Sequence, residues 1–228
     1  MERKIVITGD GSHSIAIPEL HVTYHSIHGA IQESEHVFID AGLKYLPGDT
    51  IPNPFNIFEM GFGTGLNAFL TAIEAENQKI KIQYTAVEQF PITPAEAASL
   101  NYPDVLGHAD LFHTIHECKW NEAVSVNEYF TLKKVETSLL NFSSSQHFNL
   151  VYYDAFAPGA QPDLWTKDIF EKIFHMLEPN GVLVTYCSKG DVRRAMIAAG
   201  FAVKKMPGPR GKREMLRATS PQPSPPEV

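Results

Sequence analysis

The chain has 228 residues, of which 43% are hydrophobic and 20% are charged, and its formal net charge is −7. This size and composition are typical of one soluble globular domain with a sizeable core, and the acidic charge argues against a protein that coats nucleic acid nonspecifically. The sequence has no apolar run of about 18 residues and no signal-peptide core, so we expect a cytoplasmic protein without a membrane span.

Residues 1–50 predict a small amino-terminal lobe that is rich in β-structure. Apolar residues flank the pair Asp10 and Gly11, which suits a tight turn, so residues 4–17 predict a β-hairpin. The next segment includes the strand-like residues Val37, Phe38 and Ile39. A proline-rich stretch at 47–54 indicates that this lobe ends near residue 50.

From residue 51 to residue 219, short apolar strands alternate with helical segments. This alternation predicts an α/β fold with a Rossmann-like, mostly parallel sheet and an antiparallel hairpin at its carboxyl-terminal end. Residues 220–228 contain four prolines and predict a disordered tail. The predicted strands are 55–58, 80–87, 131–135, 148–153, 181–187, 201–205 and 214–218, and the predicted helices are 66–75, 94–100, 121–129, 167–177 and 191–199.

The strongest chemical signal lies between the first of these strands and the first helix. Glycines at alternate positions let the backbone turn sharply and approach a ligand, and Leu66 stands where a dinucleotide-binding loop has glycine or alanine. The loop therefore resembles the first motif of S-adenosylmethionine-dependent methyltransferases, in which Glu59 holds the methionine ammonium directly or through water. A glycine-rich turn without a ligand is the alternative. The expected cofactor-binding residues here are Glu59, Gly61, Phe62, Gly63, Thr64, Gly65 and Asn67.

Two further acidic residues end predicted strands, where ligands bind in such sheets. Glu88 is placed to accept both ribose hydroxyls of an adenosine, although an ordinary exposed acid is the alternative. Asp154 is placed in the cofactor crevice, as a cofactor-binding residue that also orients a nucleophile, with a helix or turn cap as the alternative. Phe156 and Trp165 offer flat faces for a base, and for Trp165 core packing explains the residue equally well.

Nine Lys or Arg residues lie between Lys189 and Arg217 against two acidic residues, which gives this segment a net charge of +7. Such a segment predicts a local phosphate-binding surface, with a solvated helix and hairpin face as the alternative. The two cysteines, Cys118 and Cys187, lie far apart, and the histidines follow no tetrahedral ligand spacing. We therefore expect free thiols, no disulfide framework and no metal ion.

Together these segments make the chain similar to the methyltransferase domain of MnmC and to its stand-alone counterpart MnmD. This family completes 5-methylaminomethyl-(2-thio)uridine at the wobble position of tRNA. The residues that follow position 218 are too few to encode the oxidase domain of bifunctional members, so methyl transfer alone is expected, with a separate oxidase or upstream modification enzymes as partners. The matching segments are 29–38, 59–67, 87–91, 154–158 with Trp165, 188–194 and 211–216.

The resemblance implies S-adenosyl-L-methionine as cofactor and the anticodon loop of tRNA as substrate. It implies that Asp154, a carboxylate of ordinary pKa, orients the substrate amine, and that Ser138 or the nearby Glu136 reads the adenine edge. There are two alternatives. One is a methyltransferase of the same fold that acts on a small amine or a protein, and the other is a catalytically silent RNA-binding module. The expected substrate-binding residues are Glu33, Ser34, Phe156, Pro158 and Trp165 at the base, and Lys189, Arg193, Arg194, Lys212 and Arg213 at the phosphates of the anticodon stem.

Overall fold

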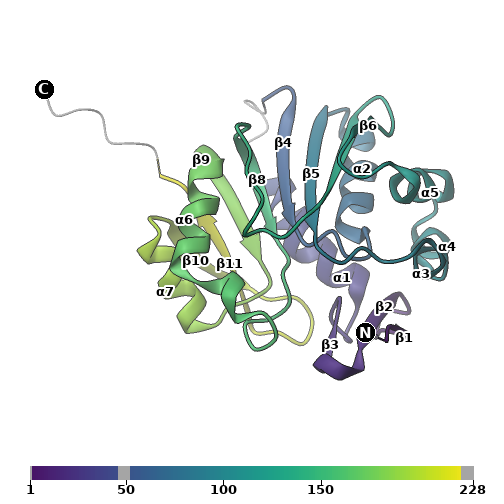
Figure 1. The fold of residues 1–228 in the computed structure, drawn as a ribbon, viewed down its shortest axis with the longest axis horizontal. Helices are drawn as coiled ribbons and strands as arrows, with labels where there is room; N and C mark the ends of the chain where they lie inside the picture. The colour runs from purple at the N-terminus through teal and green to yellow at the C-terminus, as the bar shows by residue number, and fades with distance from the viewer. Residues whose placement is uncertain (1, 46–51, 222–228) are drawn as a thin grey trace, which may run out of the picture.

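An eight-stranded sheet forms the middle of the molecule, with helices on each side of it (Figure 1). The computed structural model describes residues 2–45 and 52–221. The strand order is β10-β11-β9-β8-β4-β5-β7-β6. The five central strands, from β9 to β7, pair in parallel, whereas β10, β11 and β6 pair antiparallel with their neighbours. The strands are β4 (Phe55–Met60), β5 (Ile82–Glu88), β6 (Ala123–Ser125), β7 (Phe130–Glu136), β8 (Phe148–Tyr153), β9 (Leu177–Thr185), β10 (Ala202–Pro207) and β11 (Glu214–Thr219).

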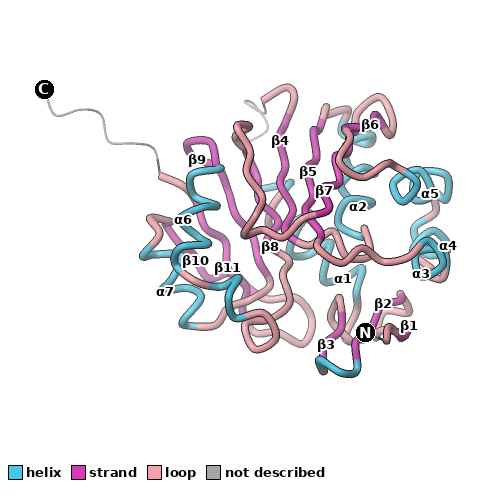
Figure 2. The backbone as a smooth tube through the Cα atoms, viewed as in Figure 1, coloured by secondary structure: helices cyan, strands magenta, loops and turns pink. Residues whose placement is uncertain are grey.

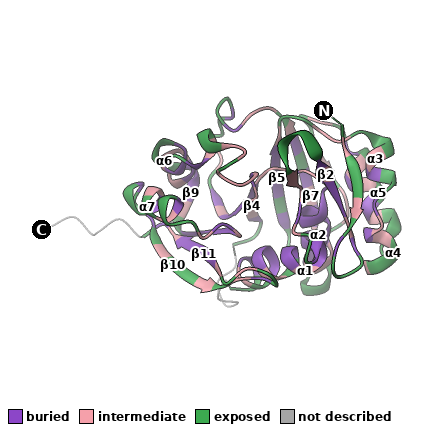
Figure 3. Ribbon diagram, turned by 90° about the horizontal axis from the view of Figure 1, so that it is seen from below, coloured by how far each residue is buried: buried purple, intermediate pink, exposed green. Residues whose placement is uncertain are grey.

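Helices cover both faces of this sheet, so its central strands are buried on both sides (Figures 2 and 3). Successive side chains of a strand point to opposite faces. In β8, Leu150 and Tyr152 therefore pack on the side of α2, and Val151 and Tyr153 pack on the side of α6. The helices are α2 (Leu66–Gln78), α3 (Pro94–Ala98), α4 (Tyr102–Leu106), α5 (Ala109–Glu117), α6 (Lys167–Met176) and α7 (Gly190–Ala198), with a short 3₁₀ turn η5 (Pro162–Trp165).

A separate antiparallel sheet of three strands is built from the amino-terminal residues. Its strands are β1 (Lys4–Ile7), β2 (His13–Ile17) and β3 (Val22–Thr23), followed along the chain by helical residues in α1 (Ala30–Ser34), η2 (Glu35–Asp40) and η3 (Leu43–Tyr45), with η1 (Pro18–Leu20) between β2 and β3. The hairpin turn is ordered by the Asp10 carboxylate, which accepts hydrogen bonds from the Ser12 backbone N–H (3.1 Å) and from the Gln32 backbone N–H (3.0 Å). The predicted hairpin at 4–17 is confirmed.

The prediction of a strand at Val37, Phe38 and Ile39 is wrong, because these residues lie in the helical segment η2. All three are buried, and the Phe38 ring lies 5.1 Å from the Tyr152 ring on the main sheet. A short apolar run has the same pattern in a buried strand and in a buried helix turn, so periodicity did not separate them. The predicted lobe boundary near residue 50 and most of the predicted tail lie outside the described residues.

The prediction of a helix at 121–129 is also wrong. Asn121 has a φ of 64°, which ends any helix there, and its side-chain oxygen accepts a hydrogen bond from the Glu136 backbone N–H (3.2 Å). The following residues form β6 against β7. The other predicted strands and helices are present, with shifted ends, and β9 starts four residues before the predicted 181.

We expect the substitution Phe58→Ala to lower the free energy of unfolding by about 3–5 kcal/mol. The substitution removes a buried aromatic ring and leaves a cavity that the surrounding side chains fill only in part. Phe58 is fully buried, and its ring lies 5.1 Å from the Phe142 ring and 5.3 Å from the Phe148 ring. Chemical denaturation of the full chain measures this loss. The matched control is Phe90→Ala at a ring that is 52% exposed, where we expect a change below about 0.5 kcal/mol. Equal losses in the two variants would contradict this account of the core.

Candidate active site

The loop between β4 and α2 lies at the carboxyl end of the central strand and touches the end of β8. Gly61 has a φ of +91°, and a Cβ atom at this position would lie 2.9 Å from the main-chain oxygen of Asp154. Gly63 has a φ of +53°, and a Cβ atom there would lie 3.0 Å from the Tyr24 ring. A side chain at either position is therefore excluded by conformation and by space. This explains why glycines alternate in the loop.

A cavity of about 320 Å³ opens beyond the carboxyl ends of β4, β5 and β8. Of the two residues considered for the adenine edge, Ser138 lines this cavity, whereas Glu136 is exposed at the end of β7. The other residues predicted from sequence that line it are Gly61, Phe62, Gly63, Glu88, Asp154 and Phe156. The structure thus brings together seven residues that are spread over almost a hundred positions of the chain.

Glu88 ends β5 and holds the loops on both sides of it. One carboxylate oxygen accepts a hydrogen bond from the Gly63 backbone N–H (3.0 Å), and the other accepts from the Phe90 backbone N–H (2.8 Å). Each carboxylate oxygen has a second lone pair. The side chain can therefore accept hydroxyl groups of a ligand while it keeps the glycine loop in place.

Asn67, in the first turn of α2, connects two carboxyl groups. Its side-chain nitrogen donates to Glu59 Oε1 (2.9 Å) and to Asp154 Oδ2 (2.9 Å). Glu59 is fully buried, and its second oxygen has no hydrogen-bond partner among the described residues. Burial raises the pKa of Glu59 well above its usual range, against the hydrogen bond from Asn67. Neither Glu59 nor Asn67 lines the cavity, but a buried carboxyl group with an oxygen that lacks a partner fits a cationic ligand group such as the ammonium of a methionine moiety.

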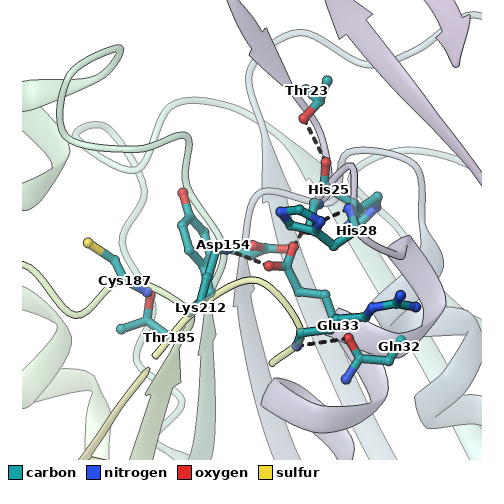
Figure 4. Close-up of polar contacts among 12 residues, drawn as sticks. Thr23, His25, His28, Gln32, Glu33, Asp154, Thr185, Cys187 and Lys212 are labelled. Carbon is teal, nitrogen blue, oxygen red and sulfur yellow. Dashed lines mark hydrogen bonds and ion pairs between the residues drawn. The ribbon is translucent and has the colours of Figure 1, made fainter. Parts of the chain in front are cut away.

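Asp154 is not the ordinary carboxylate that the sequence suggested. Burial, and next the negative charge of Glu33, raise its pKa to about 7, against the hydrogen bond from Asn67 and the positive charge of Lys212. Glu33 is itself buried, accepts a hydrogen bond from the Ser26 backbone N–H (2.9 Å) and forms an ion pair with Lys212 (Figure 4). Near neutral pH, Asp154 therefore exists both as carboxylate and as carboxylic acid.

Several predicted contacts are corrected by burial. Trp165 is 5% exposed, its indole nitrogen donates to the Phe156 carbonyl (2.8 Å), and its ring packs on Tyr153. It supports the loop that carries Phe156 and offers no open face to a base. Ser34 is fully buried away from the cavity. The Thr64 hydroxyl is also buried and lies 2.7 Å from His25 Nε2, so its side chain is not available to a cofactor.

The remaining predicted residues lie outside the cavity lining. Gly65 packs against Phe62 and His116, and Pro158 is half-buried in the loop after Phe156. The basic residues lie at the amino-terminal end of α7 and in the turn between β10 and β11. Lys189 and Arg213 are exposed, Arg194 pairs with Asp191, and Arg193 is partly buried. Lys212 turns inward to Glu33 instead of outward to solvent, which corrects its predicted role at a phosphate.

The amino-terminal sheet supplies a cavity wall that sequence reasoning missed. Ile17, Leu20, Tyr24 and His25 all line the cavity, and the Tyr24 ring meets the Phe156 ring edge to face at 5.1 Å. Arg3 fixes this wall by donating to the carbonyl of Phe90 (2.6 Å) and to that of Pro91 (3.1 Å). These contacts join residues more than 80 positions apart, so no local pattern could have revealed them.

Within residues 2–45 and 52–221, no group of three or more His, Cys, Asp or Glu side chains is placed to hold a metal ion. In the same part of the chain, no helix has both the length and the apolar character needed to cross a membrane. Cys118 and Cys187 are both free and buried.

Comparison with known proteins connects this geometry to one chemistry. A family described as S-adenosyl-L-methionine-dependent methyltransferase matches residues 97–221. The crystal structure of MNMC2 from Aquifex aeolicus superposes with a TM-score of 0.76 at 25% identity, covering 100% of this chain and 73% of that one. Spermidine synthase from Thermotoga maritima shares the fold at a TM-score of 0.55 and 12% identity, covering 96% of this chain and 68% of that one.

The predicted fold, cofactor and family resemblance are confirmed by these matches. The sheet is that of class I methyltransferases, with the antiparallel hairpin of β10 and β11 at its end. Since the family match spans more than half of the residues and the fold match spans all of them, this chain belongs to the S-adenosyl-L-methionine-dependent methyltransferases, in the group formed by the methyltransferase domain of MnmC, and is an enzyme that uses this cofactor.

Proposed function

We propose that this enzyme methylates the primary amine of 5-aminomethyl-(2-thio)uridine at the wobble position of tRNA. The observation that carries this proposal is the position of Asp154, which directly follows β8 and lines the cavity between the glycine loop and Phe156. This places one carboxyl group between a cofactor-binding loop and an aromatic wall suited to a base. The likeness to MNMC2 over the whole chain supports the same substrate class.

The residues around the cavity fit S-adenosylmethionine. When bound, this cofactor supplies a methyl group that its sulfonium has already activated for displacement by an amine. We assign Glu59 and Asn67 to the ammonium of its methionine part, because Glu59 has a buried oxygen without a partner. Glu88 is assigned to the ribose hydroxyls and Ser138 to the adenine edge. The backbone of Gly61, Phe62 and Gly63 completes this part of the site.

Asp154 has two roles in this scheme. Its carboxylate accepts a hydrogen bond from the substrate amine, which orients the nitrogen lone pair toward the methyl group and stabilises the positive charge that develops on nitrogen. With a pKa of about 7 it also accepts a proton from the substrate ammonium more readily than an ordinary carboxylate. Asn67 holds this carboxyl group in place by its 2.9 Å hydrogen bond.

The wobble base has a natural place between the amino-terminal wall and the loop after β8. A base of the anticodon loop is single-stranded and can leave its stack at modest cost. Phe156 and Tyr24, whose rings meet edge to face, present aromatic surface to it in the cavity. Pro158 follows in the same loop and is assigned to its outer end.

The tRNA backbone would meet the basic residues at this same edge of the sheet. Strand β10 runs parallel to β9, so the start of α7 and the turn after β10 both lie where the central strands end. Lys189, Arg193, Arg194 and Arg213 are assigned to anticodon-stem phosphates, with binding that weakens as salt rises. The substrate would be supplied in the cytoplasm by upstream modification enzymes.

The reaction is tested with tRNA from cells that make aminomethyl-uridine but cannot methylate it. Labelled methyl transfer from S-adenosylmethionine, followed by nucleoside mass analysis, should give the mass of methylaminomethyl-uridine. Unmodified tRNA, small amines and a protein mixture are the comparison substrates. Methylation of a small amine or a protein, with none in tRNA, would replace the proposed substrate. Tight tRNA binding without turnover on any of them would indicate a silent binding module.

For Asp154→Ala we expect kcat to fall at least about 100-fold, because the amine loses its acceptor and the developing charge loses its partner. Cofactor affinity should stay within about threefold, since the carboxyl group of Glu59 and the glycine loop remain. Calorimetry with S-adenosylmethionine and single-turnover methylation separate the two effects. Asp104→Ala, at an exposed acid on α4, is the control for the loss of a carboxyl group. A normal rate in Asp154→Ala would remove this residue from the mechanism.

For Gly63→Val we expect the Kd for S-adenosylmethionine to rise at least about tenfold. The new side chain meets the Tyr24 ring and is strained at a φ of +53°, so the loop must move out of its present path. Gly107→Val is the control, because Gly107 also has a positive φ, of +75°, but has open space around its Cβ position and does not line the cavity. Calorimetry with S-adenosylmethionine measures the Kd of both folded variants. Equal affinities would show that this loop does not shape the cofactor site.

A further inference from the structure

Lys212 does not extend to solvent with its basic neighbours. It lies in the turn between β10 and β11, and its ammonium forms an ion pair with the buried carboxylate of Glu33 on α1. The same ammonium lies 3.9 Å from the centre of the Tyr186 ring, whose hydroxyl donates to the Ala155 carbonyl (2.8 Å). Lysine is therefore held on two sides, by a carboxylate and by an aromatic face.

The partner of this lysine lies next to the proposed catalytic carboxyl group. Figure 4 shows Glu33 and Lys212 meeting beside Asp154. One oxygen of Glu33 is used by the Ser26 backbone N–H, and the other is used by Lys212. Neither Glu33 nor Lys212 lines the cavity, so the pair lies behind Asp154 as seen from the cavity. A buried carboxylate left without a cation at this position would repel the charge on Asp154.

We propose that Lys212 is a positioning residue for methyl transfer: its pairing with Glu33 keeps Asp154 available as a carboxylate. This proposal rests on the proposed function only for its consequence in catalysis. The charge coupling itself is a property of the free enzyme. It reassigns the lysine of the segment 211–216 from the tRNA surface to an ion pair with the buried Glu33.

The groups that face Asp154 act in opposite directions. Burial is the largest influence and raises the pKa of Asp154, as does the charge of Glu33, while the hydrogen bond from Asn67 and the charge of Lys212 lower it. Farther out, Asp154 also interacts with Glu59 on β4 and with the phenol groups of Tyr84 and Tyr186, whose pKa values are raised mainly by burial. Removing one member of the Glu33–Lys212 pair leaves all these others in place.

The two single substitutions therefore have opposite expected signs. Lys212→Met leaves the negative charge of Glu33 uncompensated, so the pKa of Asp154 rises and less carboxylate is present at neutral pH. Glu33→Gln leaves the positive charge of Lys212, so the pKa of Asp154 falls. The double variant Glu33→Gln/Lys212→Met removes both charges and should titrate close to the native enzyme. A purely structural role would damage all three variants in the same direction.

The direct test is a pH titration of the full chain labelled with carboxyl-¹³C aspartate, in which Asp154→Asn identifies the Asp154 signal. We expect the midpoint to rise by about one pH unit in Lys212→Met, to fall by a similar amount in Glu33→Gln and to return in the double variant. Unchanged midpoints in the folded single variants would overturn the proposal. If Lys212→Met does not fold, Glu33→Gln decides alone, because a downward shift supports the coupling and no shift refutes it.

The consequence for catalysis is measured as kcat/KM for tRNA against pH, because this ratio reports the ionisation of the enzyme before tRNA binds. The acid limb should move upward by the same unit in Lys212→Met, which is about a fivefold loss at pH 7, and Lys212→Arg should restore it. Lys205→Met is the matched control, because Lys205 pairs with Glu214 at 2.8 Å on the exposed face of the same hairpin and should leave the acid limb in place. If the Asp154 midpoints shift as expected but the enzyme does not methylate tRNA, the proposed substrate is wrong and the charge coupling to Asp154 is still supported. Shifted midpoints with an unmoved acid limb in an enzyme that does methylate tRNA would overturn the positioning role.

Discussion

The parallel register of β4 with its two neighbours is the constraint on which the rest of the site depends. Met60 is level with Val87 on β5 and with Tyr153 on β8. The next residue of each strand is therefore Gly61, Glu88 or Asp154, and the three meet at one edge of the sheet. Two backbone hydrogen bonds continue the register past the strand ends, from Gly61 to Val87 (3.0 Å) and from Asp154 to Met60 (3.0 Å). A shift of one residue in either pairing would turn these side chains to the opposite face.

Bringing these strand ends together also brings carboxyl groups together. Burial raises the pKa of Glu59 and of Asp154, and Glu33 is buried beside them. Two side chains of different kind stabilise these carboxyl groups. Asn67 donates neutral hydrogen bonds to Glu59 and Asp154, while Lys212 supplies a charge to Glu33. The acidic pocket that remains suits a positively charged cofactor, so the same charge distribution that is unfavourable for the free enzyme favours this ligand.

The local part of this structure could be predicted from sequence, and the long-range part could not. The strand at 55–58, the glycine loop and the helix after it follow from neighbouring residues, and Glu88 and Asp154 follow from their positions at strand ends. For Trp165 the sequence left base contact and core packing open, and Lys212 was placed at the surface, because an aromatic residue and a basic run have the same sequence pattern whether they face a ligand or solvent or turn inward. Their true environment depends on Tyr153 and Glu33, which are distant in the chain. Helix η2 was misjudged for a related reason, since its apolar face is defined only by the sheet beneath it.

The two sides of the cavity consequently have different origins. The side formed by the glycine loop and Glu88 belongs to one strand, helix and strand in succession, and it forms wherever β4 and β5 pair. The opposite side comes from the amino-terminal sheet, which Arg3 ties to the carbonyl groups after β5, and from the carboxyl-terminal hairpin, which Lys212 ties to α1. Both ends of the described chain must therefore dock on the sheet before Asp154 has its full set of neighbours. The glycine-loop side of the cavity is in this sense a local property of the fold, whereas the environment of Asp154 requires the completed tertiary structure.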